Sequence, residues 1–100
     1  MKKHPYSLEV GSFLKRLNDN GIVPTSIDDG GERYDVSGAK LTKEAILSVD
    51  ECSLYVTLPD GTKGVIIIML GNEKGVLVCD YSLSTLLDKV TDEHYEKWSD

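Results

Sequence analysis

The sequence predicts an α+β domain in which helices pack on an antiparallel sheet. Apolar residues near both ends recur at helical spacing, whereas the middle of the chain alternates apolar and polar residues with a period of two. Short clusters of Gly, Pro, Asp and Asn separate these segments, as turns require. One hundred residues fit one domain, so we expect a single domain over residues 1–100 in the order α-β-β-α-β-β-β-α.

The first helix is predicted over residues 8–19. Ser7 is a suitable N-cap, because its hydroxyl can accept a hydrogen bond from the first turn. Asn-Asp-Asn-Gly at 18–21 ends the helix, since Gly21 tolerates the left-handed conformation of a C-terminal cap. The apolar face of this helix is formed by Leu8, Phe13, Leu14 and Leu17.

A short hairpin follows, with strands at 22–27 and 32–36. Asp-Asp-Gly-Gly between them is typical of a turn, and it lacks the ligand spacing of a calcium-binding loop. A second, short helix is predicted over 43–49, with Thr42 as its cap. Together these segments form the N-terminal part of the predicted sheet and one of its covering helices.

Residues 52–81 are predicted to form a three-stranded antiparallel meander. The first strand, 52–58, alternates apolar and polar residues, and Pro-Asp-Gly after it suits a three-residue hairpin turn. The next strands are predicted at 63–70 and 75–81. Because residues 65–70 are apolar on both faces, we expect that strand to be central in the sheet and covered on both sides.

The turn lengths predict the register of this meander. The three-residue turn places Leu54 opposite Ile66. A five-residue loop after Leu70 places Ile67 opposite Cys79. One face then forms a plain core of Leu54, Val56, Leu58, Ile66, Ile68, Leu70, Val76 and Val78. The other face holds Ser53, Tyr55, Val65, Ile67, Met69, Leu77, Cys79 and Tyr81, a mixture suited to an interface or a lined pocket.

The last helix is predicted over 83–98. Its apolar stripe consists of Leu83, Leu86, Leu87 and Val90 and continues to His94 and Trp98. A histidine at the margin of such a stripe is more often a packed structural residue than a catalytic base.

Composition excludes several classes of function. The chain carries a net charge of −6 and no basic stripe, which disfavours direct binding of nucleic acid. The acidic excess is explained most simply by solubility, although it also suits a basic protein partner. The apolar run 65–70 is too short to span a membrane, and no apolar core of signal-peptide length follows the start, so we expect a cytoplasmic protein without membrane contact.

No catalytic or metal-binding pattern stands out. Ser-Gly-Ala-Lys at 37–40 matches the S-x-x-K string of some serine hydrolases, but their companion motifs are missing. Cys52 and Cys79 lie in apolar segments and are expected to be buried structural thiols. An enzyme using Cys79, Asp80 and His94 would need contacts that sequence spacing cannot show. We therefore expect a non-enzymatic protein without a metal or cofactor.

The remaining hypotheses concern binding. The favoured one is a protein-interaction module that acts through the second sheet face or the acidic C-terminal helix. Because the three predicted helices offer little area to cover two apolar sheet faces, we expect a homodimer, unless the two long helices cover one face each. The alternative is a small-molecule binding protein with a pocket between sheet and last helix, lined by Tyr55, Tyr81, Tyr95 and Trp98. The candidate binding residues are Tyr55, Ile67, Met69, Cys79, Tyr81, Tyr95 and Trp98.

Overall fold

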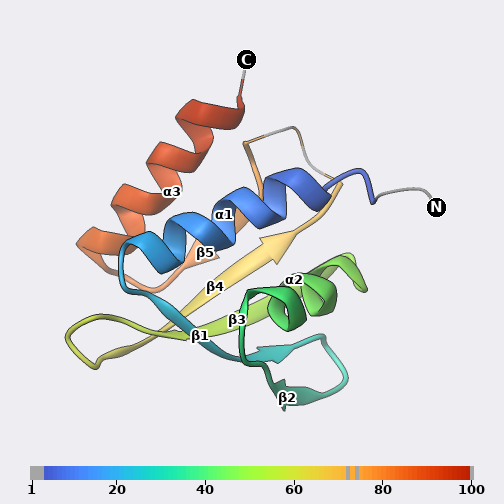
Figure 1. Ribbon diagram of the computed structural model, residues 1–100, viewed down its shortest axis with the longest axis horizontal. Coiled ribbons are helices and arrows are strands. Elements are labelled where there is room, and N and C mark those ends of the chain that lie inside the picture. The colour runs from blue at the N-terminus through green and yellow to red at the C-terminus, as the bar shows by residue number, and fades with distance from the viewer. Residues whose placement is uncertain (1–3, 72, 74, 100) are drawn as a thin grey trace.

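The computed structural model describes residues 4–71, 73 and 75–99. Its elements follow the predicted order and confirm the α+β class with an antiparallel sheet and helices near both ends (Figure 1). They are α1 (Ser7–Asp19), β1 (Val23–Asp28), β2 (Arg33–Asp35), α2 (Ala39–Leu47), β3 (Glu51–Thr57), β4 (Lys63–Met69), β5 (Val78–Tyr81) and α3 (Thr85–Trp98). Within the described part of the chain, no helix is both long and apolar enough to cross a membrane.

The sheet has the strand order β2-β1-β3-β4-β5, and all neighbouring strands are antiparallel. The central strand is therefore β3, whereas β4, which was predicted to be central, lies one position away from the middle. Within the single chain, only one face of β4 is covered. Gly64, Ile66 and Ile68 are buried, but Val65, Ile67 and the other intervening residues remain partly exposed.

The predicted register holds between β3 and β4 and at the start of β5, where Ile68 pairs with Val78, and it fails after that pair. Leu54 lies opposite Ile66 as expected. A bulge in β5 then shifts the register, so that Ile67 pairs with Asp80 instead of Cys79. One extra residue exchanges the two faces of a strand. Tyr81 therefore lies on the same face as Ile66, from which it bonds to Asp88, and not on the second face, where it was predicted.

Leu77 also departs from its predicted position. Its carbonyl accepts a hydrogen bond from the Met69 N–H, but its side chain is buried in the core instead of lying on the second face. The strand β5 begins only at Val78, and the N–H of Leu70 donates to Asp50 O at 2.7 Å on the β3 side.

All three helices lie on the same side of the sheet (Figure 1). The strands β2 and β3 run parallel to each other with β1 between them, and α2 connects them. Such connections are right-handed in nearly all proteins, which selects the face on which α2 lies. The outcome in which α1 and α3 cover one face each is thereby excluded, since both pack beside each other on the face that α2 occupies.

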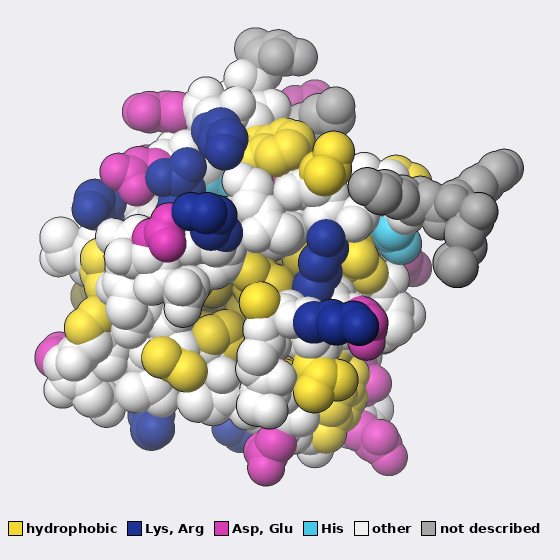
Figure 2. All heavy atoms as spheres, in the orientation of Figure 1, with side chains coloured by type: hydrophobic (Ala, Val, Ile, Leu, Met, Phe, Trp, Pro, Cys, Tyr) yellow, Lys and Arg dark blue, Asp and Glu magenta, His cyan; other side chains and the backbone are white. Residues whose placement is uncertain are grey.

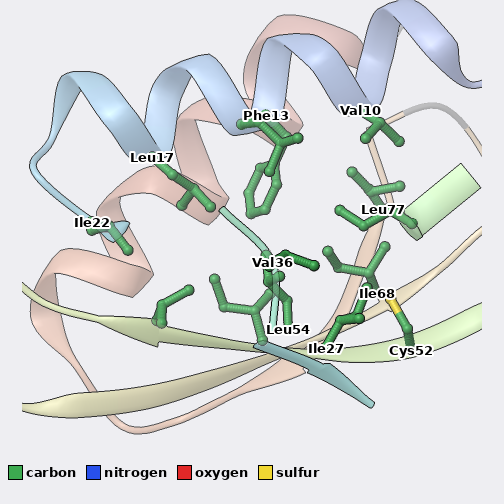
Figure 3. Close-up of a cluster of buried hydrophobic side chains, with 14 of the residues drawn as sticks. Val10, Phe13, Leu17, Ile22, Ile27, Val36, Cys52, Leu54, Ile68 and Leu77 are labelled. Atoms are coloured by element: carbon green, nitrogen blue, oxygen red, sulfur yellow. The ribbon is translucent and has the colours of Figure 1, made fainter. Parts of the chain in front are cut away.

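The core lies between this helical layer and the sheet. Figure 3 shows Val10, Phe13 and Leu17 of α1 pointing towards sheet residues that include Leu54 and Ile68. Burial of these side chains contributes most of the favourable free energy of folding. Leu8 and Leu83, both predicted on apolar helix faces, are instead 69% and 101% exposed.

The helices α2 and α3 begin at other residues than predicted, and the start of α3 explains the exposure of Leu83. The helix α2 begins at Ala39, four residues before the predicted start, and the Thr42 hydroxyl donates to Gly38 O inside the helix instead of capping it. The helix α3 begins at Thr85, because Ser84 is its N-cap and accepts a hydrogen bond from the N–H of Leu87. Leu83 therefore precedes the helix.

Candidate functional site

The sheet surface opposite the helices is the first candidate site, and we call it the open face. Burial alternates along β3 and β4, which places one residue of each pair in the core and the next on this face. Among the described elements, none lies over it (Figure 1). Paired residues share a face in antiparallel strands, so the open face comprises Val23, Ser26, Asp28, Arg33, Asp35, Glu51, Ser53, Tyr55, Thr57, Lys63, Val65, Ile67, Met69 and Asp80.

An apolar stripe runs through the middle of the open face. Tyr55 lies opposite Val65, and Ile67 and Met69 continue the stripe along β4. All four side chains are partly exposed. A continuous group of aliphatic and aromatic side chains on a surface is typical of an interaction site.

Polar side chains border this stripe on the β2 side. The Arg33 guanidinium carbon lies 3.7 Å from the centre of the Tyr55 ring, a distance at which a cation and an aromatic ring attract each other. The Nε–H of Arg33 donates to Ser26 Oγ at 3.0 Å. These two contacts hold the arginine over the sheet, where its charge remains exposed to a partner.

The structure brings together three of the predicted binding residues, Tyr55, Ile67 and Met69, on the open face. Cys79 lies at the β5 bulge and is exposed, so the expectation of a buried thiol is wrong for it. Tyr81 donates a hydrogen bond to Asp88 of α3 at 2.6 Å. That bond, with a smaller contribution from desolvation, raises the pKa of Tyr81 to about 12.

The remaining two predicted residues lie on the helical side. Tyr95 is half exposed on α3, and the Nε1–H of Trp98 donates to Ser12 Oγ on α1 at 3.1 Å. Tyr55 lies on the opposite side of the sheet from Trp98. The four aromatic residues of the alternative hypothesis therefore do not line one shared cavity.

A buried polar pair between α1 and α3 is the second candidate site. His94 Nε2 lies 2.8 Å from Glu9 Oε2, and the Gly75 N–H donates to the same oxygen at 3.1 Å. The side chains are only 1% and 4% exposed. The His94 ring also contacts Phe13 edge-on and stacks on Trp98. Sequence reasoning missed Glu9, because it is 85 residues away in the chain and no local pattern connects the two.

The electrostatics of this pair favour a neutral imidazole. Burial lowers the pKa of His94, and this effect outweighs the opposite effect of the hydrogen bond to Glu9. Its buried Nδ1 has no hydrogen-bond partner among the residues that the structure describes, so a second ring proton would have no acceptor there. The Glu9 carboxylate lies in the first turn of α1, where the helix dipole stabilises a negative charge.

The pair is best described as a clamp that joins three segments. It connects the start of α1, the end of α3 and the loop before β5. Gly75 is required there, because a Cβ at this position would lie 2.9 Å from the backbone nitrogen of Ser99. His94 is buried in this pair, whereas Cys79 is exposed at the β5 bulge.

The other groups considered are the Cys52 thiol and possible metal ligands. Burial, with smaller contributions from neighbouring carboxylates, raises the pKa of Cys52 to about 11, which keeps this thiol protonated and unreactive. Among the residues that the structure describes, no three His, Cys, Asp or Glu side chains form a cluster that could hold a metal ion.

A groove between α1 and α2 is the third candidate site. Its volume is about 470 Å³, within the range of small-molecule pockets. Figure 2 views this side and shows apolar atoms between the helices, with basic side chains near them. The lining includes Leu14, Ile22, Val23, Pro24 and Ala39, with Lys15 at its border.

Comparison with known proteins identifies no relative. No protein-family model, no curated protein and no solved structure matches the chain. Its function therefore has to be inferred from the three candidate sites.

Proposed function

We propose that the protein is a non-enzymatic protein-interaction module that binds through the open face and associates with itself. The observation that carries this proposal is the position of the helices, all three of which cover the same side of the sheet. A sheet with apolar residues on both faces needs a covering layer on each side. Tyr55, Val65, Ile67 and Met69 lack such a layer within the described part of the chain.

The sheet edges are less suitable for association than the open face. The outer strands β2 and β5 contain only three and four residues, and β5 carries the bulge. Short or bulged edge strands are a common means of preventing edge-to-edge pairing. A partner would therefore gain more contact by packing on the open face.

Two observations support a non-enzymatic protein in a reducing compartment. His94 is buried in its pair with Glu9, so a substrate could not reach it. Cys52 is buried as a thiol and not joined in a disulfide, which is the state that the cytoplasm maintains. We accordingly propose a cytoplasmic protein with a protein partner and without nucleic-acid or membrane contact.

Sedimentation of the native protein and of two matched variants tests the proposal. Ile67→Lys places a charge in the apolar stripe, whereas Leu41→Lys places one at a residue of α2 that is 57% exposed outside the open face. We expect native protein and Leu41→Lys to associate at micromolar concentration and Ile67→Lys to remain monomeric and folded. A native monomer that also fails to bind a hydrophobic dye would contradict the proposal.

The groove between α1 and α2 favours small-molecule binding as a second candidate function. Its apolar lining suits an alkyl chain, and Lys15 beside it would exchange its exposed ion pair with Asp19 for the carboxylate of the compound. Medium-chain carboxylates should then raise the melting temperature of native protein, and Ala39→Phe, which fills the groove, should abolish that increase. No shift with native protein would remove this candidate.

A further inference from the structure

The open face is ordered in rows that cross the strands, and the rows carry different charges. One row contains Arg33, Asp28, Ser53, Ile67 and Asp80. The next row contains Asp35, Ser26, Tyr55 and Val65. On β2, opposite charges thus occupy adjacent rows, and both Arg33 and Asp35 are exposed.

A two-fold axis that lies in the interface and crosses the strands between these rows would exchange them. Each strand would then lie over its own counterpart in a second copy and run in the opposite direction. By backbone position, Arg33 would lie opposite Asp35 of the second copy, and Asp35 opposite its Arg33. To form this pair, Arg33 would exchange its contacts with Tyr55 and Ser26 for the carboxylate of the second copy.

Over β4, Ile67 would meet Val65 of the second copy. Met69 would meet the alkyl chain of Lys63, and over β3 Tyr55 would meet Ser53.

A two-fold axis that runs along β3 fits the same face less well. It would place Arg33 near Asp80 of the second copy, which is favourable. It would also place Glu51 against its own counterpart and Asp28 against Ile67. A like-charge contact and a carboxylate buried against an aliphatic side chain both cost free energy.

We infer that the occupant of the open face is a second copy of this chain, related by the axis that crosses the strands, with Arg33 of each copy paired to Asp35 of the other. The inference rests on the proposed function and specifies its partner and geometry. The proposed pairing is isologous, and the strands of the two sheets lie close to antiparallel, which agrees with the aligned packing of sandwich proteins.

The open face is small for a dimer interface. The strands β3 and β4 have seven residues that each rise about 3.3 Å, whereas β2 and β5 have only three and four, so the face lies within a rectangle of roughly 24 by 23 Å. Side-chain relief makes the accessible area larger than this projection. A specific interface buries about 800 Å² per partner, so we expect a weak dimer at or below the lower end of the usual range.

Charge reversal tests the geometry. Arg33→Glu and Asp35→Arg each create two like-charge contacts in the proposed dimer, and we expect each to weaken dimerisation by about tenfold or more. A mixture of the two variants should form a heterodimer of nearly native affinity, because both contacts are then between opposite charges. Analytical ultracentrifugation of each variant and of the mixture measures this.

The mixture also controls for folding, since a variant that fails to fold could not restore association. Reversal of the exposed pair Lys15 and Asp19 on α1 should leave dimerisation unchanged. Restored association in a mixture of Arg33→Glu and Asp80→Lys would overturn the inference in favour of the axis along β3.

The remaining outcomes separate this inference from the proposed function. In one outcome, Ile67→Lys disrupts the native dimer but neither Arg33→Glu nor Asp35→Arg weakens it. This would overturn the proposed two-fold axis and leave the proposed function standing. A native monomer whose dye binding is lost in Ile67→Lys would overturn the second copy as occupant and leave the open face as a surface for another protein.

Discussion

Three successive isoleucines of β4 show how differently one strand is used on its two sides. Ile66 and Ile68 are each 1% exposed beneath the helices, whereas Ile67 between them is partly exposed on the open face. The residues are chemically identical, so hydrophobicity alone does not determine their burial. The helices determine it, because all three pack on the side to which Ile66 and Ile68 point.

The largest difference in the free energy of unfolding should be found between two variants that place the same charge on opposite sides of β4. Ile68→Asp buries a carboxylate without a partner and should lower the free energy of unfolding by more than about 4 kcal/mol, or prevent folding. Ile67→Asp should cost only about 1 kcal/mol, since its side chain reaches water. Urea denaturation at low protein concentration, where association adds little, measures both. Equal losses would show that both sides are covered.

Removing the clamp between α1 and α3 should have the next largest effect. Glu9→Ala leaves the His94 Nε2–H and the Gly75 N–H buried without an acceptor, and should cost about 2–3 kcal/mol. Glu9→Gln keeps an acceptor oxygen and should cost less. If Glu9→Ala proved as stable as native protein in urea, the clamp would contribute no net stability.

The clamp also predicts a dependence of stability on pH. The pKa of His94 is lowered from its ordinary value of 6.5 in the folded protein, so below this value the unfolded chain binds protons more readily. Stability should therefore be highest above the ordinary value and fall as the pH decreases from neutral to about 5. His94→Gln should flatten this slope, whereas His4→Gln, at an exposed position, should preserve it. An unchanged slope in His94→Gln would assign the effect to other groups.

The smallest effect is expected at the solvated side of α3. Glu96 is exposed, and Glu96→Gln should change the free energy of unfolding by no more than about 0.5 kcal/mol. Thermal unfolding of both proteins measures this difference. A larger loss would indicate that the outer side of α3 is covered by a partner.

Much of the fold could be predicted, because it depends on local patterns. The order of the elements follows from helical and alternating spacing and from turn residues. The register of β3 and β4 follows from the turn at Pro59–Gly61, where the Leu58 N–H donates to Thr62 O as a three-residue loop requires. The apolar stripe of Tyr55, Ile67 and Met69 was predicted for the same reason.

The errors concern features that no short pattern encodes. The bulge at Cys79 places Tyr81 on the side that the helices cover. Nothing in the neighbouring sequence indicates that β5 contains an extra residue. Glu9 could not be linked to His94, since their contact joins opposite ends of the chain. The predicted pocket of Tyr55, Tyr81, Tyr95 and Trp98 is wrong for a related reason. The sequence shows which residues share a face of one strand or helix, but not which face of a helix packs on which face of the sheet.

By itself, therefore, the sequence determined the class of the fold, the order of its elements and the apolar character of both sides of β4. Only the tertiary structure decided which of those sides is covered. The spacing of apolar residues predicts that a side chain avoids water. It does not predict whether that side chain packs against a helix of the same chain or against the surface of another molecule. That choice depends on the crossing of α2 over β1 and on the contacts of α1 with α3, including the pair Glu9 and His94.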